Sequence, residues 1–413
     1  MSRPLPAGPA PLRFAAGLPT RADAVVIGAG MVGAATAAWL AGTGRTVCVI
    51  DRTGPLGGTT ASGEGNILMS DKMPGPELTL ALRSARLWRE FAASAGPDFE
   101  YEPKGGVVVA HDQDQLAGLR ELCRRQRAEG IEVTELDTAG LREAEPYLAP
   151  GLAGGAFYPQ DGQVQPMLAA VAYLGAAPGL TLARADAVSL DQAGTDLRLS
   201  TDRGRIVTPV VVNAAGPWAG EVARRLSREL PVRPRRGHIL VTEPLPPLVR
   251  HKVYECDYVA TVRGEGEAGG DDTAVAYSAV VESTASGTVL IGSSRDFGGR
   301  LPGARDRSAV PERAVLAQVA RRAIALFPVL SGARAIRAYA GFRPASPDHL
   351  PIIGPDPAVP GLYHATGHEG AGICLAPGTA ELLTALIDGA PPPVDPAPFA
   401  PARFALTGGR DGR

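Results

Sequence analysis

The chain has 413 residues and a formal net charge of −2, with 41 lysines and arginines against 43 aspartates and glutamates. This length allows two or three domains that bury sizeable cores. The balance of charge excludes a general attraction to nucleic acid or a membrane surface, so we expect a small-molecule or protein partner. The cysteines lack CxxC spacing, which favours a reducing, cytoplasmic setting without disulfides or a bound metal; they are Cys48, Cys123, Cys256 and Cys374.

The N-terminal part of the chain predicts a leader followed by a βαβ unit. Residues 1–22 are rich in Pro, Ala and Gly without a signal-peptide core, and we expect a flexible leader. Residues 24–42 are apolar enough to imitate a membrane span, but three spaced glycines favour strand, turn and helix, so no transmembrane segment is expected. The expected elements are a strand at 24–27, a helix at 31–41 and a strand at 46–50.

The next segment indicates an insertion into this nucleotide-binding fold. A loop rich in Gly, Thr, Ser and Pro at 53–76 precedes a stretch with helical spacing of leucines. Residues 86–149 are therefore expected to belong to a second domain. The elements expected from this stretch onward are helices at 77–95, 113–129 and 138–145 and a strand at 105–110.

The remainder of the chain returns to the first domain and then forms a sheet. Residues 232–300 alternate apolar and polar side chains, which is typical of an antiparallel sheet, and we expect this sheet in a substrate domain. Its expected strands are 238–242, 258–262, 274–281 and 288–292. The other expected elements are helices at 167–175, 311–327 and 377–388 and strands near 180, 187, 206–213 and 335–342.

A glycine-rich turn, Gly28-Ala29-Gly30-Met31-Val32-Gly33, joins the first strand to the first helix. Glycines there permit a tight turn and bring backbone amides against a pyrophosphate at the helix N-terminus. Asp51 ends the next strand, where its carboxylate can accept hydrogen bonds from ribose hydroxyls. The alternative is that the glycines serve only helix packing and Asp51 only ends a strand. The motif with its context favours a dinucleotide, but it does not choose between NAD and FAD.

Four further segments narrow the choice when they are taken together with this turn. They are GGTTASGEGNI at 57–67, VVVNAAGPW at 210–218, AGFRPASPDHLPIIGP at 340–355 and GHEGAGICLAPGTAELL at 367–383. With these motifs the sequence resembles, over about residues 22–400, the D-amino-acid oxidase family of flavoproteins. That family includes glycine oxidase, sarcosine oxidase, and the proline, hydroxyproline and opine dehydrogenases.

The resemblance implies an α/β fold with a discontinuous, Rossmann-type FAD-binding domain and an α+β substrate domain built on an antiparallel sheet. The FAD-binding domain is expected at 23–85, 150–225 and 335–400, the substrate domain at 86–149 and 226–334, and a tail at 401–413.

The same resemblance assigns parts of the chain to FAD. The 59–62 segment is expected to wrap the pyrophosphate and ribityl chain, with Gly65 and Asn66 approaching the flavin. Backbone amides at 367–373 would face the flavin edge that becomes negative on reduction. Neither Cys256 nor Cys374 lies in a pattern for covalent attachment, so non-covalent FAD is expected. The expected contacts are Gly28, Gly30, Met31, Val32, Gly33, Asp51, Arg52, Thr59, Thr60, Ala61, Ser62, Gly65, Asn66, Ala187, Ala214, Gly216, Trp218, Gly341, Arg343, Gly367, His368, Glu369, Gly370, Ala371, Gly372 and Ile373.

Three residues are candidates for catalysis. Arg343, in Gly341-Phe342-Arg343-Pro344, is expected from the resemblance to bind the substrate carboxylate with its planar fork. Tyr258, on an expected strand, would close the pocket, or it is a core tyrosine. His368, with Glu369, would tune the site or take a proton from the substrate ammonium, or the two form an inert exposed pair. Glu64 lies in the loop expected near the flavin, where it would shape selectivity or contact a partner, and we assign it no catalytic role.

The resulting hypothesis is FAD-dependent oxidation of the C–N bond of an amino acid or secondary amine, with hydride transfer to flavin N5 and an imine product. The segments 63–78 and 282–297 and the GHEGAGI segment at 367–373 resemble the dehydrogenase branch more than glycine oxidase, which favours a D-hydroxyproline, proline or opine type of substrate. One alternative is an oxidase that uses oxygen and makes H2O2. Another is a non-catalytic FAD subunit of a larger complex. A homo-oligomer or a hetero-oligomer with electron-transfer subunits is expected.

Overall fold

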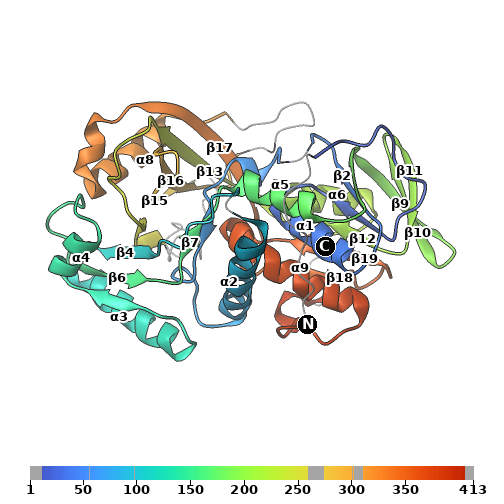
Figure 1. The fold of residues 1–413 in the computed structure, drawn as a ribbon, viewed down its shortest axis with the longest axis horizontal. Helices are drawn as coiled ribbons and strands as arrows, with labels where there is room; N and C mark the ends of the chain where they lie inside the picture. Colours follow the sequence, from blue (N-terminus) through green and yellow to red (C-terminus); the bar gives the residue numbers. More distant parts are fainter. Residues whose placement is uncertain are drawn as a thin grey trace, which may run out of the picture.

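The protein is described by a computed structural model that covers residues 12–54, 56–96, 98–258, 274–299, 301 and 310–404 (Figure 1). A six-stranded sheet, ordered β18-β19-β12-β1-β2-β8, lies at one end of the molecule; all its neighbouring strands are parallel except β18 and β19. The expected βαβ unit is confirmed, because β1 and β2 pair in parallel on either side of α1 (Met31–Gly42). The strands of the sheet are β1 (Ala24–Ile27), β2 (Val47–Asp51), β8 (Leu180–Arg184), β12 (Val211–Asn213), β18 (Ile352–Pro355) and β19 (Leu362–Thr366).

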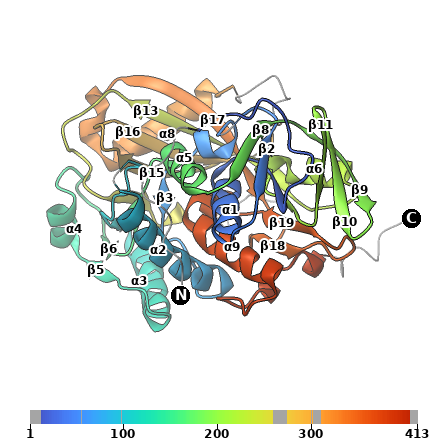
Figure 2. The same ribbon diagram turned by 45° about the vertical axis from the view of Figure 1, so that its right-hand side comes forward.

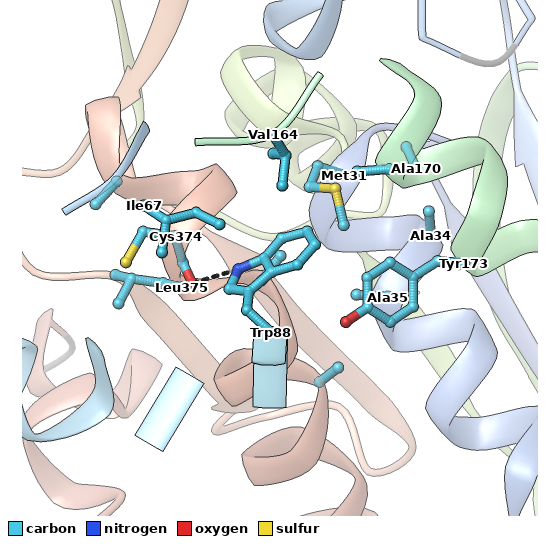
Figure 3. Close-up of a cluster of buried hydrophobic side chains, with 14 of the residues drawn as sticks. Met31, Ala34, Ala35, Ile67, Trp88, Val164, Ala170, Tyr173, Cys374 and Leu375 are labelled. Atoms are coloured by element: carbon cyan, nitrogen blue, oxygen red, sulfur yellow. Dashed lines mark hydrogen bonds between the residues drawn. The ribbon is translucent and has the colours of Figure 1, made fainter. Parts of the chain in front are cut away.

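Four helices pack together between this sheet and the rest of the molecule: α1, α2 (Pro76–Ala95), α5 (Pro166–Ala176) and α9 (Gly372–Asp388). Figure 3 shows the buried Trp88 of α2 at their junction, beside Tyr173 and Met31. The Trp88 indole N–H donates to the carbonyl of Cys374 at 3.1 Å, so its polar atom is satisfied inside the core. The alanine-rich α1 lets the neighbouring helices approach closely.

The segment Glu369–Asp388, which contains α9, is long and apolar enough to cross a membrane by length and composition alone. In the structure 61% of this stretch is buried, and α9 packs against α1 and α2. It is therefore placed as a core helix.

The second large sheet has eight strands in the order β17-β13-β16-β15-β14-β4-β6-β5. Neighbouring strands are antiparallel, as expected from the alternation at 232–300, except that β14 and β4 pair in parallel. Helix α8 (Arg313–Leu326) covers β13, β15 and β16 (Figure 2). The strands are β4 (Gly106–Ala110), β5 (Thr134–Leu136), β6 (Gly154–Tyr158), β13 (Arg233–Thr242), β14 (Lys252–Glu255), β15 (Ala276–Ser283), β16 (Val289–Arg295) and β17 (Ala335–Ala345).

Smaller elements complete the two halves. Helices α3 (Gln113–Ala128) and α4 (Thr138–Ala144) pack on β4 and β6, and α6 (Ala219–Arg225) packs on β9 of a three-stranded sheet. The remaining strands are β3 (Asn66–Ile67), β7 (Gly162–Gln163), β9 (Ala187–Ala193), β10 (Asp196–Thr201) and β11 (Gly204–Thr208). The short 3-10 helices are η1 (Thr59–Ala61), η2 (Gly216–Trp218), η4 (Pro328–Gly332), η5 (Glu369–Ala371), η6 (Ala397–Phe399) and η7 (Pro401–Phe404).

Two expected strands were wrong in detail. The strand expected at 206–213 is divided into β11 and β12 in different sheets, since Pro209 lacks the N–H that a continuous strand needs. Tyr258 was expected on a strand, but β14 ends at Glu255 and Tyr258 has helical backbone conformation. The partner strand β4 ends at Ala110, which leaves no ladder for β14 to follow further. Residues 259–262 of that expected strand lie outside the described residues.

Part of the expected leader is held by backbone hydrogen bonds, and the expected tail begins with a 3-10 helix. Residues 12–22 are anchored rather than free, because the Ala15 N–H donates to the carbonyl of Leu182 and the Ala22 N–H to that of Val207. Residues 401–404 form η7, whereas 1–11 and 405–413 lie outside the described residues. The domain boundaries stay a prediction, but β6 and β17, within segments assigned to the FAD-binding domain, pair in the eight-stranded sheet.

Candidate active site

One large cavity runs from the carboxyl ends of β1, β2 and β12 to the face of the eight-stranded sheet at β13 and β17. It encloses about 1610 Å³ of space, counting its open mouth. Its lining extends from Gly28 beside the six-stranded sheet to Arg343 on β17, so one space joins the glycine turn to the eight-stranded sheet. Its position at the carboxyl edge of a parallel sheet is where α/β folds bind ligands.

The glycine turn forms the first wall of the cavity. Gly28 has a φ of +108°, and a Cβ on it would lie 2.5 Å from the carbonyl oxygen of Ala214. A Cβ on Gly33 would lie 2.0 Å from the carbonyl oxygen of Gly28. Gly30 lines the cavity at the N-terminus of α1, where it caps the helix and approaches Thr60. The turn thus exposes backbone at a helix N-terminus, as binding of a phosphate requires.

Asp51 closes the turn from the neighbouring strand. Its Oδ2 accepts a hydrogen bond from the Ala29 N–H at 2.9 Å, and its Oδ1 accepts from the N–H groups of Thr53 and Gly54 at 2.9 and 3.0 Å. The carboxylate also lines the cavity. It therefore stitches the glycine turn to the following loop while remaining placed for a ribose.

An aromatic and polar wall lies at the far side of the six-stranded sheet. The Arg52 guanidinium lies 4.6 Å from the centroid of the Trp218 ring, and both residues line the cavity. Arg225 bridges Asp186 at 2.8 Å and Glu221 at 2.6 Å. The buried Trp218 Nε1 has no hydrogen-bond partner among the described residues. An orphaned donor in a cavity wall fits a ligand with polar ring and sugar atoms, such as the adenosine of a dinucleotide.

Arg343 lies at the opposite end of the cavity, on β17, where it is partly buried. One guanidinium nitrogen, Nη1, donates to the carbonyl of Ser294 at 3.0 Å, and Nη2 donates to Ser293 Oγ at 3.3 Å. Burial, with repulsion from Arg295, lowers the pKa of Arg343 to about 10, which leaves it charged near pH 7. Among the described residues no carboxylate forms an ion pair with it, so the cavity contains a cation without a bonded anion.

Tyr258 also lines this end of the cavity, and only 4% of it is exposed. The Arg295 guanidinium lies 4.5 Å from the centroid of its ring, and the ring of Tyr254 lies 5.0 Å away. The side chain is thus a wall of the pocket and a packed tyrosine at once.

His368 and Glu369 are buried, so the interpretation of an exposed pair was wrong. His368 Nε2 is 2.9 Å from Thr379 Oγ1, and burial lowers the pKa of His368 to about 3. An imidazole that stays neutral to that pH is poorly suited to take the ammonium proton. Glu369 Oε1 is 2.8 Å from His349 Nδ1, and its Oε2 is 3.3 Å from the Arg235 guanidinium. The pair is therefore fixed within the wall that leads into α9.

Most of the expected FAD contacts line this one cavity, and five do not: Gly33, Ala61, Gly65, Gly367 and Ala371. Three of the five are glycines needed for packing. A Cβ on Gly65 would lie 1.7 Å from the carbonyl oxygen of Val164. Gly367 has a φ of +74°, and a Cβ on it would lie 2.9 Å from the Ile352 side chain. Contact between FAD and the expected residues that line the cavity stays a prediction.

Several residues of the wall were not predicted from the sequence. Ala185 and Asp186 follow β8, and Ala365 and Thr366 end β19. The rule that ligands lie at the carboxyl ends of parallel strands was the available signal for these four. No local signal marks those that the eight-stranded sheet contributes. The other lining residues are Ile27, Ile50, Thr53, Gly57, Gly58, Gly63, Glu64, Ala215, Pro217, Glu221, Val222, Arg225, Gly237, Ile239, Phe342 and Pro344.

The fold and the cavity define a dinucleotide-binding protein with a second, charged compartment for a small molecule. Comparison with known proteins identifies the family: residues 23–386 match the family model DAO, described as FAD dependent oxidoreductase. The chain belongs to this family, which confirms the resemblance, and it is an FAD-dependent oxidoreductase. The bare backbone at Gly30 and the orphaned Trp218 Nε1 fit FAD as the bound group.

Individual relatives agree with this assignment. The chain is 31% identical over 349 residues to hydrogen cyanide synthase subunit HcnC of Pseudomonas aeruginosa, covering 80% of this chain and 75% of that protein. It is 29% identical over 393 residues to glycine oxidase of Pseudomonas putida, covering 91% and 97%.

Solved structures share the fold. Glycine oxidase from Geobacillus kaustophilus has a TM-score of 0.81 at 26% identity, covering 93% of this chain and 99% of that one. L-proline dehydrogenase from P. horikoshii has a TM-score of 0.82 at 22% identity, covering 94% and 99%. At 22% identity the second likeness speaks for the fold alone.

Proposed function

We propose that this enzyme oxidises the Cα–N bond of an amino acid or secondary amine that carries a carboxylate, of the proline, D-hydroxyproline or opine type, to an imine. The observation that supports the proposal is the charged Arg343 in the cavity wall without a bonded carboxylate among the described residues. Relatives named glycine oxidase, L-proline dehydrogenase and L-amino acid deaminase act on substrates of this class.

Arg343 carries the argument because its hydrogen bonds go to neutral acceptors. Carbonyl and hydroxyl oxygens are neutral, so they leave the positive charge of this partly buried guanidinium without a counter-charge. A carboxylate matches its planar fork with two parallel hydrogen bonds. The substrate therefore presents its carboxylate to β17.

Beyond loss of the substrate's ammonium proton, which passes to solvent water before the hydride leaves Cα, the reaction requires little acid–base chemistry from the protein. FAD supplies the hydride acceptor, at N5. Arg343 and Tyr258 orient the substrate. The backbone at Gly370 and at Gly372, the first residue of α9, offers amides and a helix N-terminus to developing negative charge. Neutral His368 shapes the wall without moving a proton. Water hydrolyses the imine after the oxidation.

The test is an anaerobic screen of D- and L-amino acids, proline derivatives and opines, following the loss of flavin absorbance. Arg343→Ala removes the charged fork and should raise KM for the best substrate about 100-fold, from roughly 3 kcal/mol for a truncated charge pair. Arg343→Lys keeps the charge but not the planar fork, and it should raise KM about tenfold.

The control is Arg337→Ala, which changes an exposed arginine of the same strand. It should leave KM unchanged. The proposal fails if no amine or amino acid reduces the flavin of the FAD-loaded protein, or if Arg343→Ala keeps the KM of the unmodified enzyme.

A larger assembly is a second candidate, since one relative is named as a subunit of hydrogen cyanide synthase. In such an assembly electrons pass to a partner subunit, and a cytoplasmic complex is our expectation. Oxygen uptake by the purified chain with substrate would instead identify an oxidase that makes H2O2. Reduction of the flavin without oxygen uptake supports the dehydrogenase.

A further inference from the structure

Glu64 is an acidic side chain in the wall of the cavity, at the end that also holds Arg343. It lies in the loop between η1 and β3, and only 8% of it is exposed. Ion pairs and metals are the usual partners of buried carboxylates. Among the described residues Glu64 forms no ion pair, and these residues contain no cluster of three metal-ligating side chains.

The two carboxylate oxygens of Glu64 are in different situations. Oε2 accepts a hydrogen bond from the Asn66 side-chain amide at 3.1 Å. Oε1 is buried and has no partner among the described residues. A buried acceptor without a hydrogen bond is unfavourable. An unsatisfied buried group of this kind points to a ligand that donates the missing hydrogen bond.

The surroundings hold this carboxylate in place and favour a cation beside it. The Lys252 ammonium donates to the Asn66 side-chain oxygen and to Glu282, and all of these groups are buried. Asn66 thereby links Lys252 to Glu64. The Lys252 ammonium is paired with Glu282, so it leaves Glu64 Oε1 without a bonded cation among the described residues.

Glu64 and Arg343 face the same short stretch of β16. A Cβ on Gly292 would lie 2.3 Å from Glu64 Oε1, so the glycine is what leaves room for this oxygen. Arg343 donates to the next two residues, Ser293 and Ser294. Two residues of backbone span at most about 7 Å, which places the opposite charges near each other without a direct ion pair. Their interaction is also seen in Glu64 raising the pKa of Arg343 against burial.

We propose that Glu64 binds the protonated nitrogen of the substrate through Oε1, opposite the carboxylate held by Arg343, and so selects amines over hydroxy acids of the same shape. This inference rests on the proposed function. It assigns the two charges of a zwitterionic substrate to two side chains from different parts of the chain. A neutral hydroxyl in place of the ammonium would leave the buried carboxylate without its counter-charge.

The experiment uses the FAD-loaded enzyme and two probes that lack a Cα hydrogen, so that no oxidation follows binding: 2-aminoisobutyrate and 2-hydroxyisobutyrate. Binding is measured from the perturbation of the flavin absorbance. The unmodified enzyme should bind the amine at least about tenfold more tightly, since a hydrogen bond to a charged group is lost with the hydroxy probe. Glu64→Gln should weaken the amine about 10- to 100-fold and leave the hydroxy probe within about threefold.

Two variants serve as controls. Glu121→Gln neutralises an exposed glutamate of α3 and should change neither affinity. Glu64→Asp keeps the charge at a greater distance and should retain part of the preference for the amine.

The other outcomes separate failure of this inference from failure of the proposed function. Equal affinity of the unmodified enzyme for both probes does so without any variant, even if Glu64→Gln fails to fold. Equal weakening of both probes makes Glu64 a support of the pocket, and loss of FAD with unchanged discrimination assigns it to the cofactor. If a screened amine reduces the flavin while Glu64→Gln keeps full preference, this inference fails and the proposed function stands. If no amine reduces the flavin but 2-aminoisobutyrate still binds preferentially, the proposed function fails instead.

Discussion

Gly33 and Gly42 lie on the same helix, α1, and the structure predicts opposite effects for replacing each by alanine. A Cβ on Gly33 would lie 2.0 Å from the carbonyl oxygen of Gly28, which is 1.4 Å short of an ordinary 3.4 Å contact. The neighbour is backbone of the glycine turn, so it cannot move aside by a rotamer change. A Cβ on Gly42 meets nothing within 4 Å.

The magnitudes follow from this difference in space. Gly42→Ala should stabilise the protein by roughly 0.5–1 kcal/mol, because alanine loses less backbone entropy in a helix. Gly33→Ala gains the same entropy but forces the turn and α1 apart, at a cost of about 1–3 kcal/mol or more. The two variants should therefore differ by about 2 kcal/mol. For 413 residues, the unfolding entropy makes each kcal/mol about 1 °C in Tm.

The assay measures Tm of the apoprotein and the FAD affinity of each variant by flavin fluorescence. Displacing the Gly28 carbonyl also displaces the amides beside Gly30, so Gly33→Ala should raise the Kd for FAD about tenfold or more, and Gly42→Ala should leave it unchanged. The reasoning is refuted if Gly33→Ala melts at or above the temperature of the unmodified protein, or if it binds FAD within twofold of it.

Two further predictions concern pH and the attachment of the cofactor. Burial lowers the pKa of His368 from 6.5 to about 3. Below pH 6.5 the unfolded chain therefore binds a proton that the folded protein does not, and the free energy of unfolding decreases as the pH is lowered, by about 3 kcal/mol at pH 4.5. In His368→Asn the free energy of unfolding, measured in urea, should depend less on pH between 6.5 and 4.5. The same pH dependence as in the unmodified protein would contradict this. No cysteine of the described residues lines the cavity, so denaturation should release all FAD, whereas flavin retained on the precipitate would show a covalent link.

Local chemistry made the cofactor half of the site predictable. The glycine turn, the strand before it and Asp51 after it lie within about 25 residues, and each has a backbone reason for its residue type. The sequence therefore predicted α1, β1 and β2 and most of the residues around the turn. Gly33 was predicted as a contact of FAD, but its missing side chain serves the approach of α1 to the turn.

The substrate half depended on strand register, which no local pattern reveals. Gly237 on β13 pairs with Gly341 on β17, and both glycines make room: a Cβ on Gly237 would lie 2.3 Å from Arg343 Nη1, and one on Gly341 would lie 2.3 Å from Ser62. Nothing near Gly237 in the sequence announces this, because Arg343 lies more than a hundred residues further along. Only the fold brings them together.

Glu64 shows the same limit from the other side. Its place in the loop expected near the flavin suggested a role in selectivity or a partner contact, but the sequence did not indicate which group it would bind. That indication appears only when Asn66, Lys252 and Gly292 surround it, two of them from the other sheet.

The division of the cavity has a consequence for how specificity is built. The glycine turn, Asp51 and Arg52 line the cavity at the six-stranded sheet. The charged groups at the other end, Arg343 and Glu64, stand on β17 and on the 59–66 loop. Arg343 is fixed by contacts with β16, and Glu64 by a chain of hydrogen bonds to β14 through Asn66 and Lys252. Since neither set of contacts passes through the glycine turn, substitutions at Glu64 or Gly292 can change which amine is accepted while the turn keeps its hold on FAD.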